Sequence, residues 1–568
     1  MNESCYFVSG AAGFVGRHLC QRLRAAGHRV RGLVRRGDSG LEALGVEVIR
    51  GDLAAAGPWQ AAVAGADYVV HCAAHAAFGG HPSDLAINIE GTLNLINAAR
   101  EAGETLRRFV FVSTIGAVDR LPGDACTEPL DDNSPLAPQS AYGRSKCRAE
   151  QLVRESGLPF SIVRPAMVVG ADMRSTSHFA VFVRMALRRS PAARLAWPGK
   201  FSLVHVDDLA AALELCATHP AAGGRTFFCA SREMQVRECF ELARPGAARL
   251  PVGWLATFAQ AFPGLFPFRL KAMLLPALTA SDAPLRGLGW EPGVPATAAL
   301  QEVIGRERAR LDPARDPGGQ TVITGAASGL GRALVGRLAG QRRQLLLVDR
   351  DGAALEQLKS EHPHCHIAVT DLADEAALAG LLNGEAWRAW PVSEIFACAG
   401  VGLRGPVLDA TAEQHVRLFK VNVLARLVLA HAALPGMIRA GFGRIVFISS
   451  SSAFQPLPYL ATYAASNAAL LHLGEAWAAE LAGTGVQMLQ VCPGGMQTNF
   501  QKTAGVKVLP DERLMGPGIV AGRIMDALAR GQTTVIISGR ARGMALAARL
   551  LPRAATVALW KKLMERLR

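Results

Sequence analysis

The 568-residue sequence has little of what marks secreted, metal-binding or disordered proteins. Its 11 cysteines include no CxxC pair and no zinc-ligand spacing, which argues against a disulfide framework and against a metal site. Only 19% of the residues are charged and 50% are hydrophobic, so extensive disorder is not expected. The first residues lack a basic stretch followed by an apolar run and a cleavage site, so we expect no signal peptide and a cytoplasmic protein.

The net charge of +14 is concentrated at one end of the chain. Residues 540–568 contain eight Lys and Arg against one Glu, a net of +7. No helix-turn-helix, RNP or zinc-finger pattern accompanies this charge, so nucleic acid is not an expected partner. Apolar and basic residues alternate at helical spacing within residues 549–568, which predicts an amphipathic tail helix. This helix either packs on its own domain, packs on a partner subunit or lies on the inner face of a membrane. The sequence does not distinguish these three alternatives.

An apolar strand, a glycine-rich turn and a helix occur twice, at residues 6–24 and 321–338. Short Val/Ile/Leu-rich runs then alternate with helical stretches, which predicts a parallel sheet with helices on both faces. We therefore predict two tandem Rossmann-type, doubly wound α/β domains, the first with a C-terminal substrate subdomain. The predicted boundaries are 1–311 for the first domain, 312–319 for a linker, 320–540 for the second domain and 541–568 for the tail.

Both glycine-rich turns have the spacing of a dinucleotide-binding loop. The first has the pattern GxxGxxG and the second GxxxGxG. Such glycines let the backbone turn tightly and approach a pyrophosphate at the N-terminus of the helix. Two such turns, each opening a strand–helix series, predict two nicotinamide-dinucleotide sites. The residues expected to contact the cofactors here are Gly10, Gly13, Phe14, Gly16, Gly325, Ser328, Gly329, Leu330 and Gly331.

The end of the second strand in each domain distinguishes the two nicotinamide cofactors. Arg35 and Arg36 stand there in the first domain, and basic side chains accommodate the 2′-phosphate of NADP. Asp349 stands there in the second domain, where a carboxylate binds a ribose 2′-hydroxyl and repels a 2′-phosphate. We predict NADP for the first domain and NAD for the second. A solvated strand end at Arg35 and Arg36 is the alternative interpretation, and Arg350 beside Asp349 weakens the contrast.

Further motifs in the first half occur together: GDL at 51–53, HCAA at 71–74, a Tyr-x-x-x-Lys motif at 142–146 and RPAMVVG at 164–170. In this combination the first half resembles the extended branch of the short-chain dehydrogenase/reductase superfamily over about its whole length. The resemblance implies further cofactor contacts from Asp52, Leu53, Ala73 and Pro165. The form of the 164–170 motif is closer to the steroid-dehydrogenase and ketone-reductase branch than to nucleotide-sugar epimerases.

The resemblance also implies an active site in the first half. Tyr142 exchanges a proton with the substrate oxygen while hydride passes to or from the nicotinamide. Lys146 shares a helix face with Tyr142, and its ammonium is expected to lower the pKa of the phenol from about 10 toward the working range. Thr114 is the first choice for the hydroxyl that orients the substrate, and Ser113 is the second.

The second half carries another set of motifs: DL at 371–372, NV at 422–423, a serine run at 449–452, a tyrosine at 463 and PGG at 493–495. This half resembles the compact, single-domain branch of the same superfamily. The resemblance implies Asn422, Ser450 and Tyr463 as active-site residues, together with position 467. Its further cofactor contacts would be Asp371, Leu372, Ala399, Gly400, Pro493, Gly494 and Thr498.

Two departures from that branch affect the second half. Residues 397–400 are ACAG where the family has Asn-Asn-Ala-Gly, and Asn467 stands where the family has a lysine. Asn467 is still able to hydrogen-bond a ribose, but it provides no positive charge to lower the pKa of the phenol. The second unit is therefore slow, rewired, or a dinucleotide-binding scaffold without turnover.

Residues 250–268 contain no charged side chain but three prolines, so we expect apolar helices lining a substrate pocket rather than a membrane span.

Taken together, these features of the sequence predict a bifunctional NAD(P)-dependent oxidoreductase of lipid metabolism. It would interconvert carbonyl and hydroxyl groups on a small hydrophobic lipid, steroid-like or acyl substrate. The alternative for the first unit is a nucleotide-sugar epimerase or dehydratase. The sequence does not decide whether the tail contacts a membrane peripherally or whether the protein forms a homo-oligomer.

Overall fold

The computed structural model describes residues 3–35, 40–75, 82–103, 105–118, 128–173, 177–188, 190–262, 265, 270, 273–274, 279–312, 318–341, 344–500, 504–505 and 514–565. Contacts between residues divide the chain into two compact units, Met1–Glu307 and Arg308–Arg568. Helix α10 (Ala296–Leu311) runs through this division, and most of the linker predicted at 312–319 lies outside the described residues.

The first unit is built on a seven-stranded parallel sheet in the order β10-β6-β5-β4-β1-β2-β3. Its strands are β1 (Cys5–Ser9), β2 (Arg29–Val34), β3 (Glu47–Arg50), β4 (Tyr68–His71), β5 (Arg108–Val112), β6 (Phe160–Pro165) and β10 (Thr226–Cys229). Alternate side chains of a strand point to opposite faces. Accordingly, Tyr6 and Val8 pack with helices α1 (Phe14–Ala25) and α5 (Val206–Thr218), whereas Phe7 packs with α2 (Pro82–Glu101) and α3 (Ala141–Arg154).

A smaller subdomain is built from segments that lie before and after β10, the last strand of this sheet in the chain. Its three-stranded sheet has the order β11-β9-β7, with strands β7 (Met167–Val169), β9 (Lys200–His205) and β11 (Arg232–Gln235). Helices α4 (His178–Leu187), α6 (Val236–Ala243) and α10 share an apolar core with it that is separate from the two cores of the larger sheet. In the described part of the charge-free segment 250–268, strand β12 (Leu250–Pro251) and helix α7 (Gly253–Ala261) take the place of a spanning helix.

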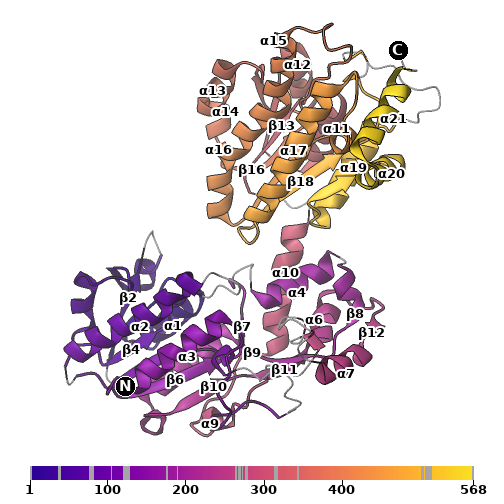
Figure 1. Cartoon of the computed structure of the whole chain (residues 1–568). Coiled ribbons are helices and arrows are strands. Elements are labelled where there is room, and N and C mark those ends of the chain that lie inside the picture. Colours follow the sequence, from indigo (N-terminus) through magenta and orange to yellow (C-terminus); the bar gives the residue numbers. More distant parts are fainter. Residues whose placement is uncertain are drawn as a thin grey trace. The chain divides into compact units, whose positions relative to one another are not determined.

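The second unit repeats the plan (Figure 1) with a seven-stranded parallel sheet in the order β15-β14-β13-β16-β17-β18-β19. Its strands are β13 (Gln320–Thr324), β14 (Gln344–Asp349), β15 (His366–Val369), β16 (Val392–Ala397), β17 (Gly443–Ile448), β18 (Val486–Cys492) and β19 (Thr534–Ile536). One face packs on α11 (Gly329–Leu338), α12 (Gly352–Glu361) and α19 (Pro517–Ala529), and the other on α13 (Glu375–Asn383), α16 (Ala425–Ala440) and α17 (Ala461–Glu480). The predicted pair of doubly wound α/β domains is confirmed.

Within the described residues, one helical stretch, Ala412–Ala440, is long and apolar enough to cross a membrane, with a mean hydropathy of 1.6. It combines α15 (Ala412–Phe419), a π-helical turn at Lys420–Leu424 and α16. Half of its most apolar window is buried, and Leu429 and Met437 belong to the core under the sheet. Its apolar character is thus explained by its place in the core of the second unit.

The tail forms two helices, α20 (Gly539–Leu550) and α21 (Arg553–Glu565), and α21 is the helix predicted from the sequence. A proline at 552 separates them, because proline cannot continue the hydrogen bonding of a helix interior. Met564 is buried against Leu457 and Leu460, and Tyr459 donates a hydrogen bond to Glu565 at 3.2 Å. The inner face of the tail therefore packs on its own unit.

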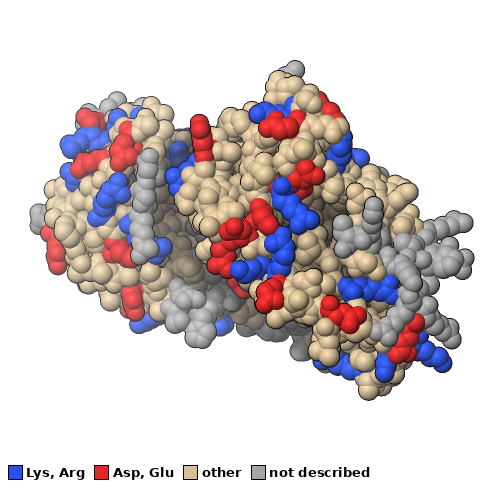
Figure 2. Space-filling view, turned by 90° about the horizontal axis from the view of Figure 1, so that it is seen from above, with Lys and Arg blue, Asp and Glu red and all other residues tan. Residues whose placement is uncertain are grey.

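Charged side chains on the visible face of the molecule are interspersed by sign (Figure 2). Lysine and arginine lie among aspartate and glutamate, with uncharged surface between them. The excess of +14 is therefore not displayed as one continuous basic field on this face.

Candidate active sites

The first glycine of each glycine-rich turn takes the same left-handed conformation. Gly10 and Gly325 have φ of +71° and +66°, a region that favours glycine. A side chain at Gly10 would lie 2.7 Å from the backbone nitrogen of Ala73, and one at Gly325 would lie 2.7 Å from that of Ala399. Each turn thus closes against the segment that follows the neighbouring strand, β4 or β16. This leaves a cradle of backbone at the N-terminus of α1 and of α11.

Helix α3 carries the Tyr-x-x-x-Lys motif into the first site. Ser140 caps the helix by accepting a hydrogen bond from the Gly143 N–H at 2.9 Å. Gly143 packs so closely on the carbonyl of Gly116 that a side chain there has no room. Residues 115–117 form a short turn that begins at Thr114, whose side chain accepts a hydrogen bond from the Gly116 N–H at 3.2 Å. The fold therefore brings the start of α3, with Tyr142, beside Thr114.

Tyr142 and Lys146 are both buried, and their burial corrects one prediction. Lys146 is 1% exposed, and its ammonium lies 4.0 Å from the centre of the Phe111 ring. Burial lowers the pKa of Lys146 to about 7, against the opposing effect of Glu150, and burial raises the pKa of Tyr142 to about 12. The expected lowering of the Tyr142 pKa by Lys146 is therefore wrong for this structure, because desolvation disfavours the charged form of both groups.

Ser113 is engaged elsewhere. Its hydroxyl donates a hydrogen bond of 2.5 Å to Glu150, and Glu150 forms a buried ion pair of 2.7 Å with Arg164. A buried carboxylate paired in this way is costly to disturb. Of the two hydroxyls proposed from the sequence, Thr114 is the one that stands at the turn next to Tyr142.

Asn88 on α2 was missed from the sequence. Its side chain accepts a hydrogen bond from the His75 N–H at 2.7 Å and donates one to the Ser145 hydroxyl at 3.0 Å. It thereby links the segment after β4 to the helical turn that separates Tyr142 from Lys146. Its side chain is 5% exposed in the structure. No clear signal in the sequence marked it, because the same stretch, INIEGTL at 87–93, also contains Glu90 and Thr92.

The other cofactor residues predicted for the first unit follow the ends of their strands. Arg35 is exposed directly after β2, and Arg36 lies outside the described residues. Asp52 accepts a hydrogen bond from the Ala54 N–H, and the Leu53 carbonyl accepts one from Asn94 at 2.7 Å. Pro165 ends β6, and the ring of Phe14 packs against Gly170.

All seventeen residues predicted for the second site line one cavity of about 610 Å³. They come from the ends of β13, β14, β15, β16, β17 and β18 and from α11, the π-helical turn and α17. They are Gly325, Ser328, Gly329, Leu330, Gly331, Asp349, Asp371, Leu372, Ala399, Gly400, Asn422, Ser450, Tyr463, Asn467, Pro493, Gly494 and Thr498. The carboxyl ends of parallel strands are where such folds bind their ligands.

At one end of this cavity, Tyr463 lies with its two predicted neighbours. The Asn467 side chain donates a hydrogen bond to the Tyr463 carbonyl at 2.8 Å. Burial raises the pKa of Tyr463, while hydrogen bonds with Ser450 and Asn467 and the charge of Arg426 act to lower it. Asn422 lies in the π-helical turn and exchanges two 2.9 Å hydrogen bonds with the backbone of Val401. Arg426 was not among the residues predicted from the sequence.

At the other end, Asp349 has two backbone partners. Its carboxylate accepts hydrogen bonds from the Ala327 N–H at 3.0 Å and the Asp351 N–H at 3.2 Å. It therefore braces the glycine-rich turn as well as lining the cavity. Asp371 forms an ion pair of 2.7 Å with Arg417.

Comparison with known proteins agrees with these geometries. Residues 6–230 match the NAD dependent epimerase/dehydratase family, and residues 320–508 match the short chain dehydrogenase family. A bovine protein named dehydrogenase/reductase SDR family member 7B is 32% identical over 251 residues, which cover 40% of this chain and 76% of that protein. The chain belongs to the short-chain dehydrogenase/reductase superfamily. It is an NAD(P)-dependent oxidoreductase made of two units.

Two further matches concern single units. A 2-keto-3-deoxy-L-fuconate dehydrogenase of Xanthomonas campestris is 32% identical over 182 residues, 32% of this chain and 59% of that enzyme. The chain thus spans only about three fifths of the length of this relative. A solved short-chain dehydrogenase from Sphingobium yanoikuyae in complex with NADPH is 28% identical, with coverage of 44% and 96% and a TM-score of 0.37.

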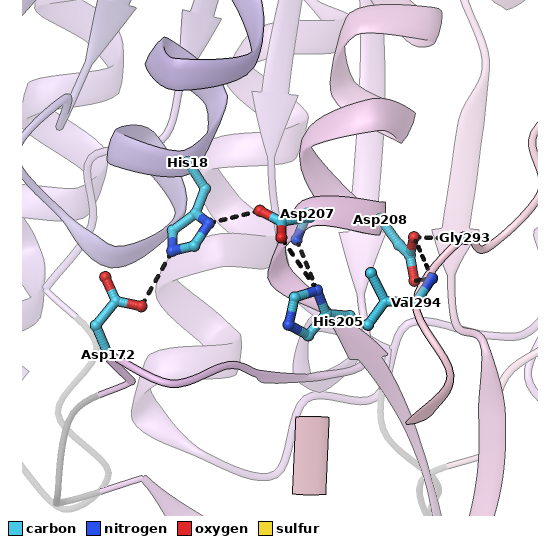
Figure 3. A network of polar contacts seen from close by, with 7 residues as sticks. All are labelled: His18, Asp172, His205, Asp207, Asp208, Gly293 and Val294. Carbon is cyan, nitrogen blue, oxygen red and sulfur yellow. Dashed lines mark hydrogen bonds and ion pairs between the residues drawn. The ribbon is translucent and has the colours of Figure 1, made fainter. Parts of the chain in front are cut away.

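A polar network ties the dinucleotide helix of the first dehydrogenase/reductase unit to its substrate subdomain (Figure 3). His18 on α1 lies between two carboxylates, with Nδ1 2.6 Å from Asp207 and Nε2 3.0 Å from Asp172. Asp207 opens α5, and Asp172 follows β7. Next to it, Asp208 accepts a hydrogen bond of 2.7 Å from the Gly293 N–H. Both ring nitrogens of His18 face acceptors, so the charged form of the ring suits this site.

This network predicts a pH-dependent stability. Burial lowers the pKa of His18, but the two aspartates outweigh that effect and raise it above 6.5. The stabilisation is therefore fully present below pH 6.5 and is lost as the pH rises through the raised pKa. We expect His18→Gln to cost about 0.5–1 kcal/mol at pH 6, a modest value because both aspartates are half-exposed, and little at pH 9. Equal losses at both pH values in thermal unfolding would contradict this assignment.

Proposed function

We propose that the first unit reduces a carbonyl group on a small hydrophobic substrate at the expense of NADPH. The observation that carries this proposal is the intact Tyr142–Lys146 pair, buried on α3 beside Thr114. The cofactor would supply the hydride to the carbonyl carbon. Tyr142 would give its proton to the carbonyl oxygen, and Thr114 would hold that oxygen by a hydrogen bond.

The burial of Tyr142 favours the reductive direction. With a pKa raised to about 12, the phenol keeps its proton at neutral pH and is available as a donor. Lys146, with a pKa lowered to about 7, changes its charge near neutrality. A drop in carbonyl reduction as the pH rises above about 7 would show that the charged form of Lys146 contributes to the reaction, since the phenol itself keeps its proton at that pH.

The cofactor choice of each unit follows from its strand end. The exposed Arg35 after β2 supports NADP in the first unit, because a guanidinium pairs well with a 2′-phosphate. Asp349, which lines the second cavity, supports NAD there, since its carboxylate would face the same position. The backbone cradles at Gly10 and Gly325 fit a pyrophosphate in both units.

A hydrophobic substrate is supported by the groups around both sites. The subdomain of the first unit has an apolar core that reaches Phe14 and Met167 beside the dinucleotide turn. Apolar side chains of Met496, Phe500 and Trp560 line the second cavity. For the second unit we propose the same chemistry with NADH at a lower rate, because Asn467 replaces the usual lysine.

Nucleotide-sugar chemistry is the second candidate for the first unit, favoured by the match of residues 6–230 to the NAD dependent epimerase/dehydratase family. One assay separates the two candidates. The full chain is mixed with hydrophobic ketones and aldehydes or with nucleotide sugars, and NADPH and NADH absorbance is followed. We expect NADPH consumption with a hydrophobic carbonyl. Conversion of nucleotide sugars without net NADPH consumption would favour the second candidate.

We also propose that the tail contacts anionic membranes through its outer face. Leu546, Leu550 and Leu559 are exposed on α20 and α21, among the basic residues of this segment. Replacing these three leucines with glutamine is expected to weaken binding to phosphatidylserine-containing vesicles at least about tenfold in a flotation assay. Leu408→Gln, at an exposed leucine outside the tail, is the matched control. Equal flotation of all three proteins, or of none, would leave the tail as a packed helix pair only.

A further inference from the structure

Arg426 occupies an unusual place in the second site. It lies on α16, four residues after Asn422, and both residues line the cavity that holds Tyr463. Its side chain is 4% exposed. Nothing in the family motifs requires a cation at this position, and a buried arginine is costly unless its hydrogen bonds are satisfied.

Two contacts fix the guanidinium at the carboxyl edge of the sheet. One terminal nitrogen donates a hydrogen bond of 2.5 Å to the Ile448 carbonyl, at the end of β17. The other donates one of 2.5 Å to the Ala399 carbonyl, just after β16. The Nε–H is buried and has no hydrogen-bond partner within the described part of the chain. Arg426 is thus held by both terminal nitrogens, while its Nε–H has no partner among the described residues.

We propose that Arg426 supplies the positive charge that the family otherwise places on a lysine four residues after the active-site tyrosine, and so keeps Tyr463 competent for proton exchange. The charge would reach the tyrosine from α16 instead of from its own helix. This inference rests on the proposed turnover in the second unit. Arg426 is a positioning residue in this scheme, since it acts through Tyr463.

The charges around Tyr463 support this role. Burial lowers the pKa of Arg426 only to about 10, so it stays charged at neutral pH. Cys398 also faces this end of the cavity, and burial raises its pKa to about 12, so its thiol is neutral. The other charged residues among those described as lining the cavity follow β14 and β15 or lie on α15: Asp349, Arg350, Asp371 and Arg417. No carboxylate among these lining residues neutralises Arg426 next to Tyr463.

The proposed role of Arg426 explains together the two departures of the second half from its family, at residues 397–398 and at residue 467. Asn467 removes a cation from the helix of Tyr463, and Arg426 adds one to the same cavity from α16. Alanine and cysteine at 397–398 replace two family asparagines beside the carbonyl that Arg426 contacts. The site therefore keeps one buried positive charge near its tyrosine.

The test is a direct titration of Tyr463 in the full chain. The protein is labelled with 3-fluorotyrosine, and its five tyrosines are followed by ¹⁹F NMR, with Tyr463→Phe to assign the signal. Arg426→Gln, which keeps a hydrogen-bond donor but loses the charge, is expected to raise the Tyr463 midpoint by at least about one pH unit. Adding Asn467→Lys to that variant is expected to bring the midpoint back. Thermal unfolding verifies that each variant folds.

If the titration midpoint of Tyr463 is unchanged in folded Arg426→Gln, the proposal is wrong. This holds whether or not the second unit has activity. If the Tyr463 midpoint is raised but the second unit reduces no carbonyl, the charge coupling is supported and the proposed activity of the second unit is wrong. Failure of the coupling and failure of the proposed activity are therefore distinguishable.

Arg426→Lys gives a second test that does not depend on the folding of Arg426→Gln. A buried lysine loses its proton at lower pH than arginine, so NADH-linked reduction by this variant should fall at alkaline pH where the parent does not. Identical pH profiles would contradict the proposal, because a purely structural role predicts no new titration.

Discussion

Tyr142→Phe is expected to lower kcat/KM for NADPH-linked carbonyl reduction by about 10²–10⁴-fold, the usual contribution of a positioned proton donor. Phenylalanine keeps the ring that packs at the start of α3 but has no proton to give. The thermal stability and NADPH affinity of the first unit should change little, since the substitution removes only one hydroxyl. Steady-state NADPH oxidation with the best carbonyl of the panel measures the effect.

Two matched variants control this experiment. Tyr68→Phe removes a hydroxyl from another tyrosine of the same unit, which packs against Tyr6 in the core, and should leave the rate unchanged. Tyr463→Phe should leave NADPH-linked reduction intact and affect only the slower NADH-linked reaction. Loss of all activity in Tyr463→Phe with full activity in Tyr142→Phe would reverse the ranking of the two sites.

Reversing the charge after β2, with Arg35→Asp and Arg36→Ser together, is expected to weaken NADPH binding by about ten- to more than a hundredfold. A charge-assisted contact to the 2′-phosphate contributes about 1.5–3 kcal/mol, and each 1.4 kcal/mol is a factor of ten. NADH has no 2′-phosphate, so its affinity should change much less. Fluorescence titration of the full chain with each cofactor measures both constants.

Asp349→Asn is the reciprocal change in the second unit. Asparagine keeps an oxygen that accepts the Ala327 N–H but has no charge to repel a 2′-phosphate, so NADPH binding at this site should strengthen. Asp349→Ala would remove the brace of the glycine-rich turn as well and would confuse the two effects. If none of these substitutions changes the affinity for NADPH, the side chains at the ends of β2 and β14 are solvated without contacting the cofactor, and the cofactor assignment is wrong.

Much of the fold followed from the sequence because its signals are local and periodic. Apolar strands that alternate with helices, and two glycine-rich turns, require only the geometry of a parallel sheet. The residues of the second site were predicted largely from the family resemblance, and all seventeen line one cavity because the ends of neighbouring parallel strands lie at one edge. Tyr142 and Lys146 were placed by a four-residue spacing on one helix.

What the sequence missed depends on burial and on contacts between distant segments. The pKa of Tyr142 is raised rather than lowered because both partners of the pair are desolvated, which spacing does not reveal. Asn88 and Arg426 are two of several polar residues in their helices, and only the fold shows that the first contacts helix α3 and that the second lines the second cavity. The sequence predicted the last amphipathic helix of the tail but left its partner open, and only the fold shows that Met564 and Trp560 pack beside the second cavity.

Transfer of a labelled hydride tests the central assignment most directly. The full chain is incubated with a hydrophobic carbonyl substrate from the panel and NADPH deuterated at the transferred position of the nicotinamide, and the product is analysed by mass spectrometry. We predict one deuterium on the carbinol carbon of the product with the parent chain and with Tyr463→Phe, and no labelled product above background with Tyr142→Phe. Undiminished label transfer by Tyr142→Phe, or no transfer to any carbonyl of the panel by the parent chain, would contradict a carbonyl reductase centred on Tyr142 and Lys146.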